Sequence, residues 1–444
     1  MKQKQDIKLS DHFSYGKILR FTAPSIGMMI FTSIYGVVDG FFVSNFVGKT
    51  PFAAVNFIFP FLMMLGAIGF MIGTGGSALV SKTMGERNME KANRIFSMLV
   101  YASIVMAVII AVLGIVFLRP LASALGAQGQ LLEDSVRYGR IILLALPAFV
   151  LQMEFQNFFI TAEKPKLGLY VTVASGVTNM VLDAVLVIPF GLVGAALATA
   201  LSQVVGGVIP LVYFFRPNSS LLRLGKTNYD GKALGKTCTN GSSELLSNIS
   251  MSLVNMLYNV QLLAYAGENG IAAYGTMMYV NLVFLAAFIG YSIGTAPVIS
   301  FHYGAQNQGE LKSLLRKSAV IIGICSVAML AAAYLLSAPL SQLFVGYDAA
   351  LYEMTVHGFR IFAWSFLFAG FAIFFSGFFT ALNDGLTSAV ISFLRTLVFQ
   401  VAAVLLLPKI WDLDGIWWSI VIAEAMAVLV GTGFLAGKQK KYQY

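Results

Sequence analysis

The chain has 444 residues, of which 58% are apolar and only 11% charged, and its mean hydropathy is +0.80. A soluble domain usually carries about a quarter charged residues, so this composition excludes an ordinary soluble protein and predicts one that lipid surrounds in part. We attribute the net charge of +9 to basic loops at a membrane surface, not to nucleic-acid binding. Two cysteines and three scattered histidines give neither a disulfide framework nor a metal-ligand spacing.

Apolar runs long enough to cross a bilayer, roughly 20 residues each, recur twelve times along the chain. The first six are predicted as membrane-spanning helices at 16–40, 52–80, 95–118, 138–161, 168–189 and 192–215. A basic stretch follows, and the remaining six are predicted at 242–266, 271–300, 318–338, 357–381, 387–408 and 414–437. The predicted fold class is therefore an all-α integral membrane protein with twelve transmembrane helices.

The distribution of basic residues predicts the orientation of these helices. If the N-terminus is cytoplasmic, 22 of the 29 Lys and Arg residues fall on the cytoplasmic side and five on the other, while Arg360 and Arg395 lie inside spans. Cytoplasmic loops carry an excess of Lys and Arg. We therefore expect both termini in the cytoplasm of a multi-pass protein.

The two sets of six spans resemble one another at an offset of 219–221 residues. The segment Gly69-Phe-Met-Ile-Gly-Thr74 matches 290–295, Phe158-Phe159 matches 378–379, and Gly194 matches Gly415. We predict an N-terminal lobe at 1–218, a basic cytoplasmic linker at 219–241 and a C-terminal lobe at 242–444. Parallel repeats of this kind are typical of transporters, with a cavity where the halves meet.

Two carboxylates of the first half lie in spans without a basic partner. Asp183 follows Asn179 by four residues and Asp39 follows Tyr35 by four, which places each pair on one helix face. An unpaired carboxylate in the membrane is either protonated or neutralised by a bound cation, and both states suit ion coupling. The alternative is that each side chain simply reaches water from the end of its helix.

Further polar residues in spans allow two interpretations each. Glu154, with Gln152 and Asn157, gives the fourth span a polar face that either lines the cavity or bonds to another helix. Glu244 is either an acidic contact for a cationic substrate or a helix cap. Asn259 stands 220 residues after Asp39, which predicts that ion chemistry is confined to the first half.

The remaining signals favour structural roles or exclude other chemistry. Glu424 and Arg395 are expected to pair with each other in the last two spans. The sequence contains no G-x-x-x-x-G-K-[ST] phosphate loop and no Ser/His/Asp constellation. We therefore expect neither direct use of ATP nor an enzyme.

Several of these residues carry a resemblance to a known family. The matching segments are Pro24…Tyr35…Asp39-Gly40, Gly85-x-x-Asn88, Asn179-x-x-Leu182-Asp183 and Gly194-Ala-Ala-Leu-Ala-Thr199. They resemble the multidrug and toxic compound extrusion (MATE) transporters, and the Ser243-Glu244-Leu245 segment is similar to their MepA-like bacterial subgroup. One departure is Ile160-Thr-Ala-Glu-Lys164, where the family usually has an R-x-x-G-[ND] turn.

The resemblance implies export of cationic, aromatic compounds in exchange for H⁺ or Na⁺ across the cell membrane, with no other cofactor. It places the coupling proton or Na⁺ at Asp39, Asn179, Asp183 and Thr199. The expected substrate or cavity residues, from the resemblance and from the patterns above, are Tyr35, Gln152, Glu154, Asn157, Glu244 and Asn259. The expected partners are small organic cations and the lipid bilayer, and the expected assembly is a monomer.

One alternative within the same superfamily is a flippase for lipid-linked precursors. Such proteins typically line their cavity with basic residues that meet pyrophosphate. Only Arg360 and Arg395 lie in spans here, which favours the antiporter.

Overall fold

A computed structural model of the chain describes residues 7–444, except for the side chains of Ser44 and Lys49. Within this range every regular element is a helix, which confirms the predicted all-α class. Lys2 and Lys4, which entered the count of basic residues, lie outside the described residues.

The helices fall into two successive sets. Those of the first half are α1 (Tyr15–Phe46), α2 (Lys49–Gly85), α3 (Met89–Ala124), α4 (Gly129–Leu144), α5 (Leu146–Thr161), α6 (Pro165–Leu182), the π-helical turn η1 (Asp183–Val187) and α7 (Ile188–Phe215). Those of the second half are α8 (Gly231–Gly304), α9 (Gln308–Val345), α10 (Ala349–Phe362), the short 3₁₀-helix η2 (Ala363–Ser365), α11 (Phe366–Ala381), α12 (Gly385–Phe393), the π-helical turn η3 (Leu394–Val398), α13 (Phe399–Leu406) and α14 (Pro408–Tyr442).

Among the described residues, nine apolar helical segments are long enough to span a membrane, and α4 with α5, bent by 54°, makes a tenth. Three of the nine contain a break. The break in α14, at Trp411 and Asp412, lies only a few residues after the helix begins and adds no span. The 74-residue α8 is broken at Gly267 (φ +63°), and the 51-residue segment 165–215 at Gly191 (φ +53°). A continuous 74-residue helix would be about 110 Å long, several times the hydrocarbon thickness of about 30 Å. The breaks at Gly267 and Gly191 therefore each separate two spans, and the total agrees with the twelve predicted.

The repeat is visible in the backbone as well as in the sequence. Residues with a positive φ, the left-handed backbone conformation, recur at corresponding positions in the two halves, 219–221 residues apart. The pairs are Gly48 and Gly267, Arg87 and Gln306, Glu163 and Asn383, and Gly191 and Asp412. A positive φ is uncommon for residues other than glycine. The recurrence of a positive φ at four corresponding positions shows that the two halves share one backbone arrangement, which we call their shared frame. The predicted linker 219–241 is in part helical, because α8 already begins at Gly231.

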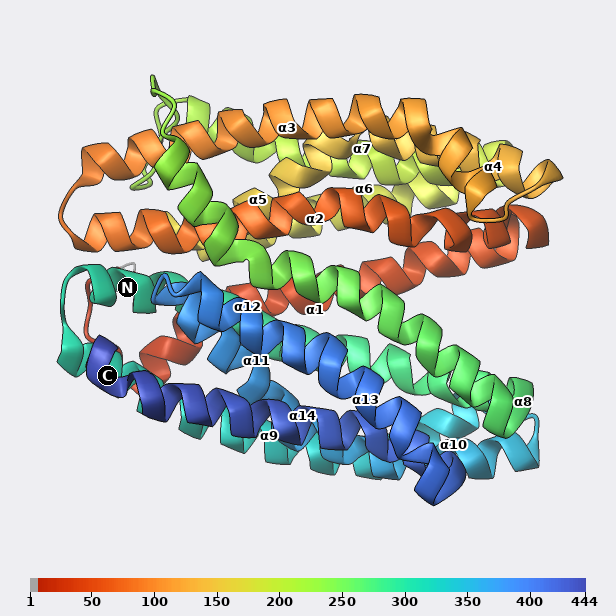
Figure 1. The fold of residues 1–444 in the computed structure, drawn as a ribbon. Coiled ribbons are helices and arrows are strands. Elements are labelled where there is room, and N and C mark those ends of the chain that lie inside the picture. The colour runs from red at the N-terminus through yellow and green to blue at the C-terminus, as the bar shows by residue number, and fades with distance from the viewer. Residues whose placement is uncertain (1–6) are drawn as a thin grey trace, which may run out of the picture.

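The halves form two bundles, and α1 and the first part of α8 cross between them (Figure 1). Both ends of the described chain lie at the same end of the bundles (Figure 1), which we call the terminal side. Toward the other end the two bundles diverge. At the terminal side the chain before α8 packs on the first half, since Thr227 donates a hydrogen bond to the carbonyl of Arg94 at 2.8 Å.

Glycines allow α2 and α8 to touch along the seam between the halves. A Cβ atom on Gly241 would lie 1.9 Å from the carbonyl oxygen of Met71, and one on Gly304 would lie 2.0 Å from that of Lys82. No side chain fits at such distances. These contacts fix the two backbones against each other in the part of the seam that faces the terminal side.

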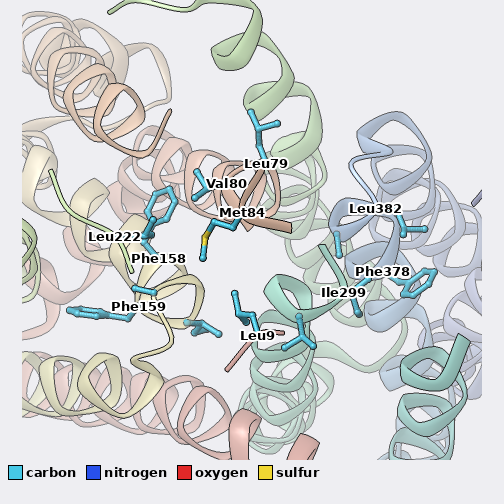
Figure 2. Packing of buried hydrophobic residues seen from close by; sticks show 14 of the residues in the cluster. Leu9, Leu79, Val80, Met84, Phe158, Phe159, Leu222, Ile299, Phe378 and Leu382 are labelled. Carbon is cyan, nitrogen blue, oxygen red and sulfur yellow. The ribbon is translucent and has the colours of Figure 1, made fainter. Parts of the chain in front are cut away.

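The segment before α1, residues 7–14, also links the two halves at the terminal side. Leu9 and Phe13 are buried, and Leu9 lies between Phe159 of the first half and Ile299 of the second (Figure 2). The amide of Leu9 donates to Glu163 Oε1 at 2.6 Å, and that of Phe13 donates to Glu310 Oε1 at 2.8 Å. The segment thus joins the loop after α5 to the start of α9, and the protein is closed at its terminal side.

Candidate ion and substrate site

The predicted coupling residues come together from three helices of the first half. Asp39 lies on α1, Asn179 on α6, Asp183 at the start of η1, and Thr199 on α7. Two glycines bring these helices close. A Cβ atom on Gly176 would lie 2.8 Å from the ring of Tyr35 on α1, and one on Gly194 would lie 2.0 Å from the carbonyl of Leu186.

The side chain of Asp39 lies beside those of Asp183, Asn179 and Thr199. Six buried polar atoms of these four residues have no hydrogen-bond partner within the described part of the chain. An unsatisfied buried polar group costs about 1–3 kcal/mol, and a charged one costs more. Two carboxylates, an amide oxygen and a hydroxyl in one place are the ligand types that a hard cation prefers, and the carboxylates also accept protons.

Two tyrosines border this cluster. Tyr35 lies between Asp39 and Gln152. Tyr138 on α4 is buried, its hydroxyl faces Thr199, and it is close enough to both carboxylates to interact with them electrostatically. Sequence reasoning missed Tyr138, because a single tyrosine at the start of a span forms no pattern with its neighbours.

The polar face of the fourth span is mostly engaged in helix packing. Gln152 Nε2 donates to Ser175 Oγ on α6 at 3.3 Å, and Asn157 Nδ2 donates to the carbonyl of Met153 in its own helix at 3.2 Å. Glu154 is fully buried, and Ser103 Oγ on α3 donates to its Oε2 at 2.5 Å. Of the two interpretations of Glu154, the geometry favours the bond between helices. Only Gln152 reaches the cluster, through Tyr35.

The second half requires a correction. Asp39 lies nine residues before the left-handed Gly48, and the residue nine before the left-handed Gly267 is Tyr258, not Asn259. The offset of 220 fails here because the second half has two more residues between this glycine and the next matching segment. Asn259 is exposed on α8.

The counterpart of the ion cluster in the second half is neutral. The corresponding residues, at offsets of 219–221, are Tyr258 for Asp39, Gln400 for Asn179, Ile420 for Thr199 and Val404 for Asp183. Tyr258 donates a hydrogen bond to Gln400 Oε1 at 2.7 Å, and its ring stacks on that of Tyr274 with centroids 5.3 Å apart. This position therefore holds a satisfied hydrogen bond where the first half holds two carboxylates.

The other intramembrane charges of the second half lie near one another. Arg395 Nε donates to both carboxylate oxygens of Glu424, at 3.1 and 2.8 Å, which confirms the predicted pair. Glu244 is half-buried on α8, where Arg395 acts on it electrostatically. Since α8 begins at Gly231 with Asp230 as its cap, Glu244 is not a helix cap. Each π-helical turn contains a charged residue, Asp183 in η1 and Arg395 in η3, and such turns are frequent at functional sites.

The model of the MatE family matches this chain twice, at residues 24–185 and 245–406. The chain belongs to the MatE family. The double match also confirms that its two halves are repeats of one unit. The multidrug export protein MepA of Staphylococcus aureus (strain MRSA252) is 24% identical over 417 residues, covering 93% of this chain and 91% of its own length. MepA of Staphylococcus haemolyticus (strain JCSC1435) is 26% identical over 439 residues, covering 97% and 95%.

Solved structures share the fold of this MatE protein. A MATE transporter in complex with MaL6 has a TM-score of 0.93 and 23% identity, covering 99% of this chain and all of its own. The outward-facing conformation of a multidrug resistance MATE family transporter of the MOP superfamily also has a TM-score of 0.93 and 23% identity, covering both chains fully. A MATE protein in the bent conformation has a TM-score of 0.87 at 23% identity, covering 98% of each chain.

Proposed function

We propose that this protein is a secondary antiporter that exports cationic, aromatic drugs or other toxic organic compounds in exchange for H⁺ or Na⁺. It works as a monomer by alternating access in the cell membrane, with both termini in the cytoplasm. Its relatives among the multidrug export proteins support the class of substrate. The basic residues gathered on the terminal side support the orientation.

The observation that carries the proposal is the cluster of unsatisfied polar atoms around Asp39 and Asp183. A proton or Na⁺ at this cluster reduces the repulsion between the two carboxylates and holds α1 against α6 and α7. Binding of the ion therefore favours the state in which these helices pack together. A substrate that binds the other state better is coupled to the ion through this difference in affinity.

The charges of the spans support a cationic substrate over an anionic one. Arg395 is neutralised by Glu424, and the guanidinium of Arg360 lies over the ring of Tyr334 at 5.2 Å. The acids Asp39, Asp183 and Glu244 have no such ion pair among the salt bridges of the described residues. A flippase for lipid-linked pyrophosphates would need the opposite balance of charge, so it remains the second candidate.

Efflux of a cationic dye such as ethidium from proteoliposomes tests the proposal, first with a Na⁺ gradient and then with a pH gradient. We expect one of the two gradients to drive transport in the wild type, and Asp39→Asn and Asp183→Asn each to abolish it. Asp412→Asn is the matched control, because it removes an exposed carboxylate at a left-handed position that asparagine tolerates.

Unchanged dye efflux in both variants of the cluster would refute the coupling residues. Transport of a lipid-linked pyrophosphate together with the absence of dye efflux would favour the flippase.

A further inference from the structure

A cavity of about 250 Å³ opens at the terminal side of the first half, away from the ion cluster. It lies between the start of α1 and the loop that leads into α6. Its lining combines three basic residues with apolar and aromatic ones, among them Arg20, Lys164, Lys166, Phe21, Leu167 and Tyr170. A pocket with this lining suits a ligand that has an anionic part and an apolar part.

The charge of the cavity is positive. Arg20 comes from α1, while Lys164 and Lys166 flank the first residue of α6, where the positive end of the helix dipole adds to their effect. Among the described residues of the lining, Glu163 is the only acid. Its Oε1 accepts the amide hydrogen of Leu9, and burial raises the pKa of its carboxyl group. Arg20 and Lys166 thus bring two basic groups to the cavity, while the carboxyl group of Glu163 is hydrogen-bonded to the N-terminal segment.

The mouth of the cavity is bordered by exposed aromatic and apolar side chains. Tyr170 is 65% exposed and Leu19, next to Arg20, is 45% exposed. Exposed aromatic rings beside basic residues are typical of the level of lipid headgroups. The buried Phe21 and Pro24 provide an apolar wall on the inner side. A lipid can therefore place its phosphate among the basic groups while its chains stay in the bilayer.

The corresponding corner of the second half is filled by the chain itself. There the loop before α12 carries Asp384 in place of Lys164, and Asp384 accepts hydrogen bonds from Lys438 Nζ at 2.6 Å and from Tyr442 at 2.8 Å. The shared backbone arrangement therefore does not by itself create an open basic cavity. The cavity of the first half results from the particular residues that line it.

We propose that this cavity binds the phosphate headgroup of an anionic phospholipid from the leaflet on the terminal side. Arg20 and Lys166 contact the phosphate, and the exposed face of Leu19 and Tyr170 receives the start of the acyl chains. Because Glu163 in the same cavity holds Leu9, the bound lipid also stabilises the N-terminal segment that closes the protein. The proposal does not depend on which ion or drug the protein transports.

Native mass spectrometry of the purified full chain in a neutral detergent tests this site. The protein is incubated with an equimolar mixture of phosphatidylglycerol and phosphatidylcholine, and the bound lipids are counted. We expect the wild type to retain phosphatidylglycerol preferentially and Arg20→Gln/Lys166→Gln to bind it at least about tenfold more weakly, given the usual effect of each basic residue near an anionic surface. Lys226→Gln/Lys236→Gln, which removes two exposed lysines of the terminal side, should bind as the wild type does.

Two results would overturn the proposal. Equal loss of phosphatidylglycerol in both double variants would mean that general surface charge, not the cavity, attracts the lipid. Displacement of the lipid by an equal concentration of inorganic phosphate or glycerol 3-phosphate would mean that the cavity takes a free anion. Circular dichroism and gel filtration of the Arg20→Gln/Lys166→Gln protein establish that it is folded, so that weaker binding reports on the site.

Discussion

The two halves of this protein share one backbone frame but treat the same polar position in opposite ways. In the first half, Asp39 and Asp183 face each other, and Asp39 Oδ1 and both carboxylate oxygens of Asp183 have no hydrogen-bond partner among the described residues. In the second, Tyr258 and Gln400 form a neutral hydrogen bond at the corresponding place. Buried polar groups in proteins are nearly always satisfied, so this difference between the repeats supports the ion site that we propose in the first half. The duplication preserved the frame, and the polar residues of the first half alone suit an ion.

We expect the largest loss of stability from removing one member of the buried Arg395–Glu424 ion pair in the second half. The first-half counterpart of Glu424 is Gln203, so Glu424→Gln makes the two halves alike at this position. The change leaves Arg395, whose side chain is 15% exposed, without its partner. Removing one member of a buried pair costs about 3–5 kcal/mol. We expect a large drop in the thermal unfolding temperature of the detergent-solubilised protein.

Replacing both members of this pair provides the control. Arg395→Leu/Glu424→Leu leaves no unpaired charge and should recover most of the lost stability. If Glu424→Gln is as stable as the wild type, the ion pair between Arg395 and Glu424 does not stabilise the fold.

The next largest effect is a loss of ion affinity, which should differ between the corresponding polar positions of the two halves. Asn179→Leu and Gln400→Leu remove an amide from corresponding places in the two halves. The first takes a ligand from a charged cluster, which is worth about 1.5–3 kcal/mol, so the apparent affinity for the coupling ion should fall roughly 10- to 100-fold. The second should leave that affinity unchanged and lower only the unfolding temperature. Both affinities are measured from the ion dependence of dye efflux in proteoliposomes.

Equal loss of ion affinity in Asn179→Leu and Gln400→Leu would contradict the assignment of the ion to the first half. In that case the Tyr258 position would also have to take part in coupling.

The sequence predicted those features that depend on composition and on a constant offset. The twelve spans follow from apolar length, and the repeat follows from matches such as Gly69 with Gly290. The Arg395–Glu424 pair was also predictable, because two opposite charges in adjacent spans have few other partners. The approach of Asp39 to Asp183 was implied only by the family resemblance, since it depends on packing at Gly176 and Gly194.

Other features could not be predicted from sequence patterns, because they depend on how the helices pack in three dimensions. Tyr258 replaces Asn259 as the counterpart of Asp39 because the register within one helix pair differs from the average offset. Tyr138 reaches Thr199 through the bend between α4 and α5, which no residue pattern in that stretch predicted. The π-helical turns around Asp183 and Arg395 were likewise outside the reach of apolar periodicity.

A smaller effect tests the closure at the terminal side. Glu90 and Glu310 both lie in the first turn of a helix capped by asparagine. The side chain of Glu90 is 78% exposed, and among the described residues it bonds only to Arg94 of its own helix. That of Glu310 is 7% exposed and bonds to His12 Nδ1 at 2.6 Å and to the amide of Phe13. We expect Glu310→Gln to cost about 1–2 kcal/mol and Glu90→Gln less than about 0.5 kcal/mol, measured by thermal unfolding.

Labelling of a cysteine at position 9 reports whether the same change opens the terminal side. In a background with Cys238 and Cys325 replaced by serine, Leu9→Cys should react slowly with a polar maleimide, because Leu9 is buried. Glu310→Gln should accelerate this reaction and Glu90→Gln should not. Equal rates in all three proteins would show that Glu310 does not hold the N-terminal segment.

The smallest effect concerns two acids at equivalent loops whose stability should depend on pH with different slopes. Burial raises the pKa of Asp384, but the hydrogen bonds from Lys438, Tyr442 and Thr387 outweigh it, so that the net pKa lies below its ordinary value of 3.8. Its contribution is therefore complete above the unfolded pKa and lost only as the pH falls through the lower folded value. Asp384→Asn should cost about 1 kcal/mol, with a constant deficit between pH 5 and pH 8.

Glu163 in the first half should show the opposite trend. Burial is the main cause that raises its pKa above the ordinary 4.5, so the folded state binds the proton more tightly than the unfolded chain, and stability falls as the pH rises through this window. In Glu163→Gln the amide oxygen can still accept the hydrogen of Leu9, and the penalty for ionisation is gone. The variant should match the wild type near pH 4.5 and become more stable than the wild type as the pH rises to 8. Unfolding temperatures of both variants across this range measure the two slopes, and a flat difference for Glu163→Gln would show that its carboxyl group ionises in the folded protein without cost.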